Sequence, residues 1–84
     1  MNIGFTPEAW ADYVHWQATN PSMVQRINLL LKDTLRNPRE GVGKPEPLKW
    51  GLLGCWSRRI DREHRLVYRI KDDTLHVISC RYHY

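Results

Sequence analysis

The chain has 84 residues, of which 42% are hydrophobic and 26% charged, with a formal net charge of +4. This length and composition predict one compact domain over residues 1–84 and exclude an intrinsically disordered chain. No apolar run approaches the roughly 20 residues that a membrane-spanning helix needs, and the N-terminus lacks the pattern of a signal peptide, so we expect a cytoplasmic protein with no membrane contact.

A short strand over residues 2–5 and two helices are predicted in the N-terminal half. Thr6-Pro7 and Asn20-Pro21 each resemble an N-cap residue followed by proline at the first helical position. In the first helix the partly apolar stripe is Trp10, Tyr13, Val14 and Gln17. In the second helix a stronger stripe, which should pack against a sheet, is Val24, Ile27, Leu30, Leu31 and Leu35.

Residues 37–47 contain three prolines and two glycines, which predicts a loop rather than a helix or a central strand. Four apolar segments follow, near residues 48–53, 55–61, 64–71 and 74–81, with short turn-like connections. Short connections require antiparallel pairing. The expected fold is therefore α+β, with two N-terminal helices packed on one face of a four- to five-stranded, mainly antiparallel sheet.

Alternation within the third segment separates its two faces. Leu66, Tyr68 and Ile70 form the apolar set that the helices should cover, so Arg65 and Arg69 should project from the opposite face. Among the aromatic residues, we expect Trp10 and Trp56 in the core and Trp50 on a partner or RNA surface. His64 and His76 are expected to be structural, and Cys55 and Cys80 to be buried free thiols.

Several kinds of site are disfavoured by spacing. The histidines and cysteines form no Cys-x-x-Cys or His-x-x-x-His pair, so no metal site is expected. Gly41-Val-Gly43-Lys44 lacks the spacing of a phosphate-binding loop, and these glycines are expected in turns. Neither Ser57 nor Cys55 has the flanking histidine and acid of an activated nucleophile. We expect no cofactor.

The positive charge is concentrated in the second part of the chain. From residue 36 onward there are eleven Lys/Arg and six Asp/Glu residues. This asymmetry favours a polyanionic partner such as RNA or DNA, although composition alone fits an ordinary soluble surface equally well.

The same region contains one acid and one imidazole among its cations: Lys44, Glu46, Lys49, Arg58, Arg59, Arg65, Arg81, His83 and Tyr84. Cleavage of RNA through its own 2′-hydroxyl needs a base, cations that stabilise the charged phosphorane, and an acid for the departing 5′-oxygen. By residue type alone, Glu46 is more often a solvated surface acid, and the penultimate His83 a frayed tail.

Five stretches resemble the YoeB family of the RelE toxin superfamily, in the family's order. They are Trp10-x-x-Tyr13-x-x-Trp16, Gly43-Lys-Pro-Glu-Pro-Leu-Lys49, Gly54-x-Trp-Ser-Arg-Arg-Ile60, Glu63-His-Arg-Leu-Val-Tyr68 and Cys80-Arg-Tyr-His-Tyr84. The resemblance implies a RelE-like, microbial-RNase-like fold. It also implies an endoribonuclease that cuts messenger RNA in the ribosomal A site without a metal, leaving a cyclic phosphate and a 5′-hydroxyl.

The same resemblance assigns roles to individual residues. Glu46 is implied as the general base, His83 as the general acid and Arg65 as the transition-state stabiliser. The implied substrate-binding residues are Lys49 and Arg59 on the phosphate backbone, Glu63 orienting neighbouring cations and Tyr84 at the scissile nucleotide, with Lys44 and Arg58 as further cations of the site.

The resemblance implies partners as well: the ribosome and its RNA, a YefM-like antitoxin, a homodimer, and operator DNA bound by the toxin-antitoxin complex. Two other functions remain open. One is a non-cleaving toxin of the same fold, such as a ParE-like gyrase poison, and the other is a simple nucleic-acid-binding module.

Overall fold

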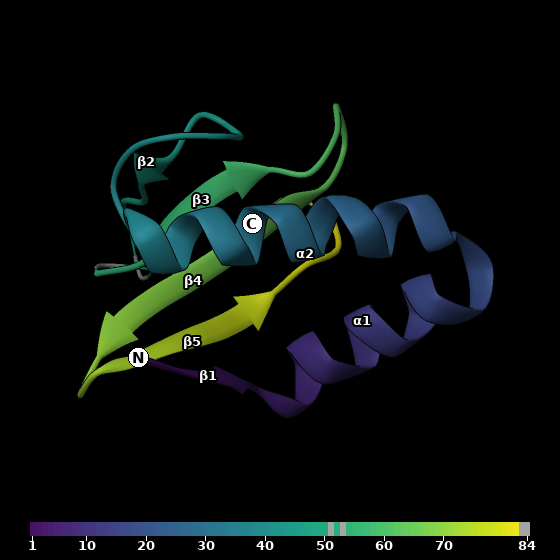
Figure 1. Cartoon of the computed structure of the whole chain (residues 1–84), viewed down its shortest axis with the longest axis horizontal. Helices are drawn as coiled ribbons and strands as arrows, with labels where there is room; N and C mark the ends of the chain where they lie inside the picture. Colours follow the sequence, from purple (N-terminus) through teal and green to yellow (C-terminus); the bar gives the residue numbers. More distant parts are fainter. Residues whose placement is uncertain (51, 53, 83–84) are drawn as a thin grey trace.

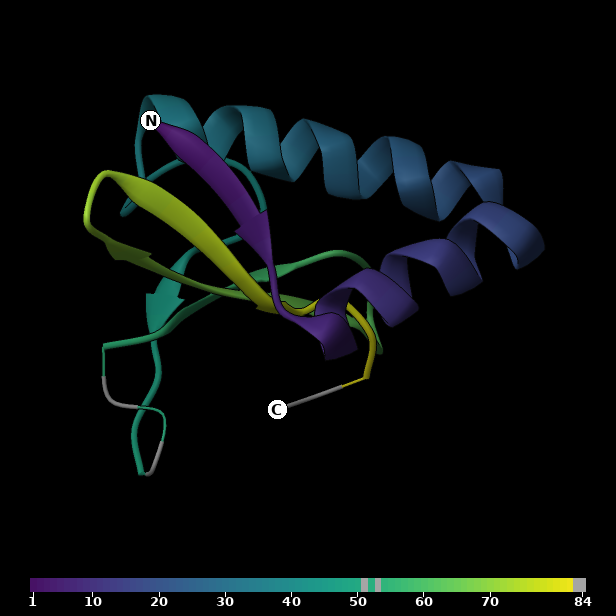
Figure 2. The same cartoon turned by 90° about the horizontal axis from the view of Figure 1, so that it is seen from below.

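The computed structural model describes residues 1–50, 52 and 54–82. Both helices cover one face of a five-stranded sheet whose strand order is β1-β5-β4-β3-β2 (Figures 1 and 2), as the sequence predicts. The elements are β1 (Asn2–Phe5), α1 (Pro7–Thr19), α2 (Pro21–Arg36), β2 (Glu46–Pro47), β3 (Trp56–Arg59), β4 (Arg65–Lys71) and β5 (Thr74–Ser79).

Both helices begin at the prolines that the sequence indicates, but their caps differ. The Thr6 hydroxyl oxygen accepts the backbone N–H of Ala9 at 3.0 Å, which satisfies one of the unpaired N–H groups at the start of α1. Asn20 precedes α2 without a side-chain cap, and its Oδ1 accepts the Ser22 hydroxyl instead. The fixed φ of Pro21 is therefore the main local signal for the start of α2.

The main core lies between the helices and the sheet. The stripe predicted for α2 is confirmed, because Ile27 and Leu30 are fully buried against it. The stripe predicted for α1 is wrong: Trp10 is 53% exposed, and Trp16 is buried in its place. Trp16 also donates its indole N–H to the Cys80 carbonyl at 2.9 Å, so the polar group of this ring is satisfied inside the core.

The N-terminal strand closes one edge of the sheet by parallel pairing with β5, with Asn2 opposite Thr74. The Thr6 hydroxyl extends this contact by donating to the Ile78 carbonyl at 2.9 Å. The other strand pairs are antiparallel, with an irregularity in the β4–β5 register between Val67 and Tyr68. The long connection that a parallel pair needs is supplied by the intervening helices and strands.

The segment between the central loop and β3 differs from the prediction. The strand expected over 48–53 is instead the two-residue β2, which lies within the stretch predicted as loop. Trp50 has a φ of 52°, a left-handed conformation that turns the chain and ends the extended backbone. Pro47 is tolerated in β2 because this strand is at the sheet edge, where one side of the backbone needs no donor.

A second, smaller apolar cluster lies on the face of the sheet that the helices leave uncovered. Leu48, Cys55 and Val67 are its buried members. The 48–54 segment extends away from α2 on this side (Figure 2). Both cysteines are buried free thiols, as predicted, and burial raises the pKa of the Cys80 thiol to about 12, with the nearby Asp12 carboxylate adding to the shift. In the residues that the structure describes, no helix has the length and apolarity to cross a membrane.

Candidate active site

The strand register places three of the predicted site residues on the same side of the sheet. Glu46 in β2 is opposite Ser57 in β3, and Arg59 in β3 is opposite Arg65 in β4. Directly opposed residues share a face, as do residues two apart along a strand. Glu46, Arg59 and Arg65 therefore project from the helix-free face, and the orientation predicted for Arg65 is confirmed.

The spacing between Glu46 and Arg65 follows from sheet geometry. Two strand-to-strand steps separate their backbones by about 10 Å across the sheet, and a two-residue offset adds about 7 Å along the strands. Both side chains are long, and they border the space above Ser57 and Val67. This arrangement brings a carboxylate and two guanidinium groups around an area large enough for a phosphodiester.

Arg65 is held by the turn between β3 and β4. Its Nη1 donates to the carbonyls of Asp61 at 2.8 Å and His64 at 3.1 Å. The Asp61 carboxylate in turn accepts the backbone N–H groups of Glu63 at 2.9 Å and His64 at 2.7 Å. This turn fixes one edge of the guanidinium, so that the rest of its planar fork has a defined direction.

Asp61 was not among the predicted site residues. Partial desolvation tends to raise the pKa of its carboxyl group, but the hydrogen bonds from His64 and Glu63, together with nearby positive charge, hold that pKa below its ordinary value. Asp61 is therefore charged at neutral pH and keeps the turn closed. The sequence signal for it is local, because an aspartate two and three residues before the donors is typical of such turns.

The end of the described chain is bound to the same turn. The Tyr82 N–H donates to Nδ1 of His64 at 2.7 Å, and the Arg65 N–H donates to the Tyr82 carbonyl at 3.1 Å. His64 is buried against the edge of Trp16 at 4.8 Å, so its predicted structural role is confirmed. His83 and Tyr84, expected as general acid and nucleotide contact, lie outside the described residues.

Arg58 is not at the surface, which contradicts its expected role in substrate binding. Its side chain is fully buried, and Nη1 donates to Oδ2 of Asp33 at 2.6 Å. Its other acceptors are the carbonyls of Asn37, Glu40 and Val42 and the hydroxyl of Tyr68. Alternation within β3 could have revealed this, because Arg58 shares a face with the core residue Trp56 while Arg59 does not.

The Arg58 contacts fix the loop that leads to β2. The hydrogen bond from the Val42 N–H and then that from Arg58 hold the pKa of the Asp33 carboxyl below its ordinary value of 3.8. Gly43 has a φ of +84° and lies against Leu30 and the Arg59 carbonyl, where an added Cβ would come within 2.8 and 3.1 Å. Gly41 and Gly43 thus serve turns, as predicted.

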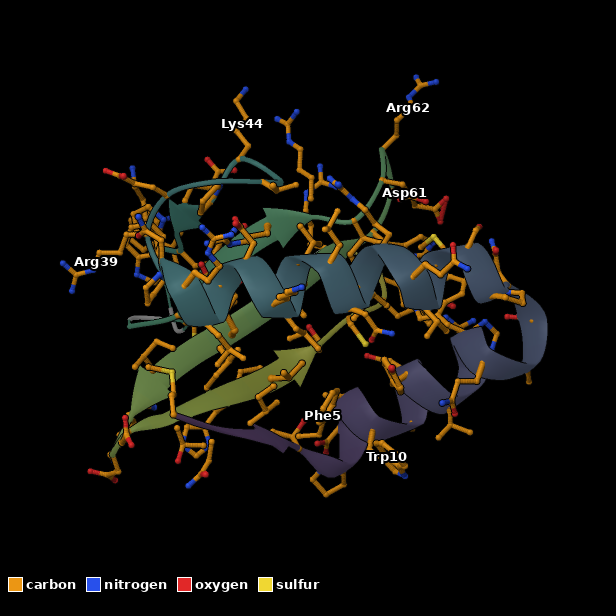
Figure 3. The ribbon with its side chains drawn as sticks, in the orientation of Figure 1. Phe5, Trp10, Arg39, Lys44, Asp61 and Arg62 are labelled. Atoms are coloured by element: carbon orange, nitrogen blue, oxygen red, sulfur yellow. The ribbon has the colours of Figure 1, made fainter. Side chains whose placement is uncertain are left out.

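A hollow of about 500 Å³ adjoins Glu46. Lys49 and Trp50 line it, and Trp50 is 88% exposed, in agreement with its expected surface position. Lys44 projects outward from the loop before β2 (Figure 3). Glu63 is exposed, with its carboxylate 3.7 Å from Nε2 of His64. Among residues 1–50, 52 and 54–82, no group of three His, Cys, Asp or Glu is placed to hold a metal ion.

Comparison with known proteins identifies similar chains. Residues 5–84 match the family described as YoeB-like toxin of bacterial type II toxin-antitoxin system. Toxin YoeB of Escherichia coli K12 is 56% identical over 84 residues, covering all of both chains. Two solved structures from Staphylococcus aureus are each 50% identical, covering 100% of this chain and 98% of theirs: a heterotetrameric YoeB-YefM toxin-antitoxin complex, with a TM-score of 0.92, and a YoeB dimer, with a TM-score of 0.93.

Proposed function

Because this chain belongs to the YoeB-like toxin family of bacterial type II toxin-antitoxin systems, we propose that it is an endoribonuclease that cleaves messenger RNA in the ribosomal A site and so inhibits translation. The observation that carries the proposal is the placement of Glu46 and Arg65 on one helix-free face, with Arg59 beside them. A simple binding module would need the arginines but has no use for the carboxylate.

The proposed reaction is an internal transesterification. Glu46 accepts the proton of the 2′-hydroxyl, and the 2′-oxygen attacks the adjacent phosphorus. Arg65 stabilises the charge that develops on the phosphoryl oxygens, and His83 donates a proton to the departing 5′-oxygen. The products are a cyclic phosphate and a 5′-hydroxyl, and the proton balance closes without a metal.

The proposed contacts with RNA use the cations around this centre. Arg59 is opposite Arg65 and exposed, so it can contact a neighbouring phosphate. Lys49 and Lys44 would hold the strand on the Glu46 side, and Trp50 offers an exposed ring for stacking on a base. Glu63 and Tyr84 complete the set as a neighbouring acid and a contact to the scissile nucleotide. Arg58 is not included, because its guanidinium is buried.

Ribosome dependence has a physical rationale at Glu46. Its side chain is exposed, and a solvated glutamate is a weak base at neutral pH. Packing against ribosomal RNA would exclude water from the carboxylate and fix the substrate geometry. We therefore expect cleavage on ribosomes to be much faster than cleavage of the same RNA in solution.

The proposal also includes partners and location. The two Staphylococcus aureus structures, of a YoeB-YefM complex and of a YoeB dimer, support a YefM-like antitoxin and a homodimer for this chain. Binding of the toxin-antitoxin complex to operator DNA and a cytoplasmic location follow from the same function. Acidic antitoxin segments and RNA would both be favoured by the net charge of +4.

The test is primer extension on a messenger RNA in a translating extract. Glu46→Gln should lower the cleavage rate by about 10²- to 10⁴-fold, because the variant keeps the shape of the residue and loses the base. His83→Ala should have an effect of the same order. Glu8→Gln is the matched control, since it neutralises an exposed acid on α1, away from the helix-free face.

Wild-type cleavage by Glu46→Gln would refute the assignment of the base. Intact transcripts with halted translation in the presence of the wild-type chain would refute the nuclease function itself and favour a non-cleaving toxin.

A further inference from the structure

Strand β4 presents a row of cations on the helix-free face. Arg65, Arg69 and Lys71 share this face because they are an even number of residues apart, and Val67 lies between the first two. The row extends about 20 Å along the strand, from the candidate active site to the opposite end of the sheet. Because β4 lies between β3 and β5, the row crosses the middle of the sheet.

At the far end of this row is a shallow hollow of about 190 Å³. Arg69, Lys71, His76, Thr6 and Ile78 line it. The register explains why they meet: Arg69 is opposite His76 across the β4–β5 pair, and Ile78 follows two residues later on the same face. The hollow is smaller than the roughly 300 to 1,000 Å³ of most small-molecule sites, so it suits one unit of a polymer better than a whole free ligand.

The two cations of this hollow have no ion-pair partner among the described residues. The nearest turn carries Asp72 and Asp73, but Asp73 already faces the N-terminal amine at 4.0 Å. Arg69 and Lys71 are exposed, while His76 and Ile78 are half-buried. Positive heads thus surround a partly apolar floor, which matches the alternation of phosphate and sugar or base along an RNA strand.

We propose that Arg69, Lys71 and His76 form a second RNA-backbone site that binds the substrate strand several nucleotides from the phosphate that is cut. This inference rests on the proposed function, because it assigns the occupant by the continuity of the row with Arg65. Arg69 and Lys71 contact phosphates, and the His76 ring and the Ile78 side chain support a sugar or base.

The test measures binding of the full chain to a 12-nucleotide 2′-O-methyl oligouridylate by fluorescence anisotropy at several salt concentrations. This probe lacks the 2′-hydroxyl and cannot be cleaved. In Arg69→Ala/Lys71→Ala the affinity should fall, and the slope of log K against log salt should decrease in magnitude by about 1.4, or about 0.7 for each lost phosphate contact on a single strand. A trinucleotide should bind wild type and variant equally.

Lys32→Ala/Arg36→Ala is the matched control, because it removes the same charge from exposed positions of α2. It should leave the salt slope unchanged. The swap Arg69→Lys/Lys71→Arg keeps both charges and should bind as the wild type does.

The proposal is overturned if the Arg69/Lys71 variant loses no more RNA affinity than the Lys32/Arg36 control. It is also overturned if a 12-residue polyglutamate peptide loses at least as much affinity as the RNA, because the hollow would then serve an acidic protein. Cleavage is not the readout, so a failure of the Glu46 test leaves this result interpretable, and the reverse also holds.

Discussion

Arg58 and Arg59 are neighbours in β3, yet they belong to two different regions of the molecule. Arg58 points to the helix-covered side, where it is fully buried and bound to Asp33 and to loop carbonyls. Arg59 points to the helix-free side, where it is exposed opposite Arg65. The comparison shows that strand parity, rather than residue type, separates a cation that stabilises the fold from one that is available to a ligand.

The largest expected effect is on stability and comes from the buried member of the pair. Arg58→Met should lower the free energy of unfolding by about 3 to 5 kcal/mol, because it leaves Asp33 and several loop acceptors without their partner. Arg59→Met should change it by no more than about 0.5 kcal/mol. Urea denaturation of the two variants measures the difference, and equal losses would invalidate the division between the two faces.

The loop that Arg58 holds gives a second, smaller contrast. Gly43→Ala should cost about 1 to 3 kcal/mol, because a Cβ at a φ of +84° would also crowd Leu30 and the Arg59 carbonyl. Gly54 has a similar φ of +86° but nothing within 4 Å of its added Cβ. Gly54→Ala should therefore be the milder variant in thermal unfolding, and the opposite order would argue against tight seating of the Gly43 loop.

The smallest expected effect is the pH dependence of the buried pair. The pKa of Asp33 is lower in the folded chain than its ordinary value of 3.8, so its stabilising contribution is complete above that value and is lost as pH falls through the lower folded value. Denaturation midpoints measured from pH 6 downward should therefore fall less steeply in Asp33→Asn than in the wild type. Parallel curves for the two proteins would contradict a role for this ion pair in acid stability.

Local signals in the sequence were sufficient for much of the fold. Thr6-Pro7 and Asn20-Pro21 mark the starts of both helices, and the α2 stripe gives its buried face. Alternation in β4 gives the direction of Arg65. Each of these features depends on residues within one or two turns of chain, which is why a sequence pattern can predict it.

The errors arise where distant segments decide the outcome. Trp10 is large and aromatic, but α1 lies at the margin of the sheet, so this ring packs beside Phe5 and Tyr13 at the surface (Figure 3). Ile70 continues the apolar face of β4, yet it is 37% exposed near the strand end. Arg58 is buried only because Asp33, 25 residues away, supplies its counter-charge.

The candidate site shows the same division. Parity places Arg59 and Arg65 together, but the sequence could not place Glu46 on an edge strand, because the turn at Trp50 depends on backbone geometry rather than on a glycine or proline. The role of Asp61 as the acceptor that closes the Arg65 turn was missed as well.

The parallel pairing of β1 with β5 constrains how the chain is made. The Thr6 hydroxyl and the Ile78 carbonyl are separated by 72 residues, so during synthesis the first strand has no neighbour until β5 has left the ribosome. At about 5 to 20 residues per second, this delay lasts several seconds. A nascent chain therefore cannot complete its sheet while most of it is being translated, and an activity that depends on the finished sheet is withheld until synthesis of β5 is over.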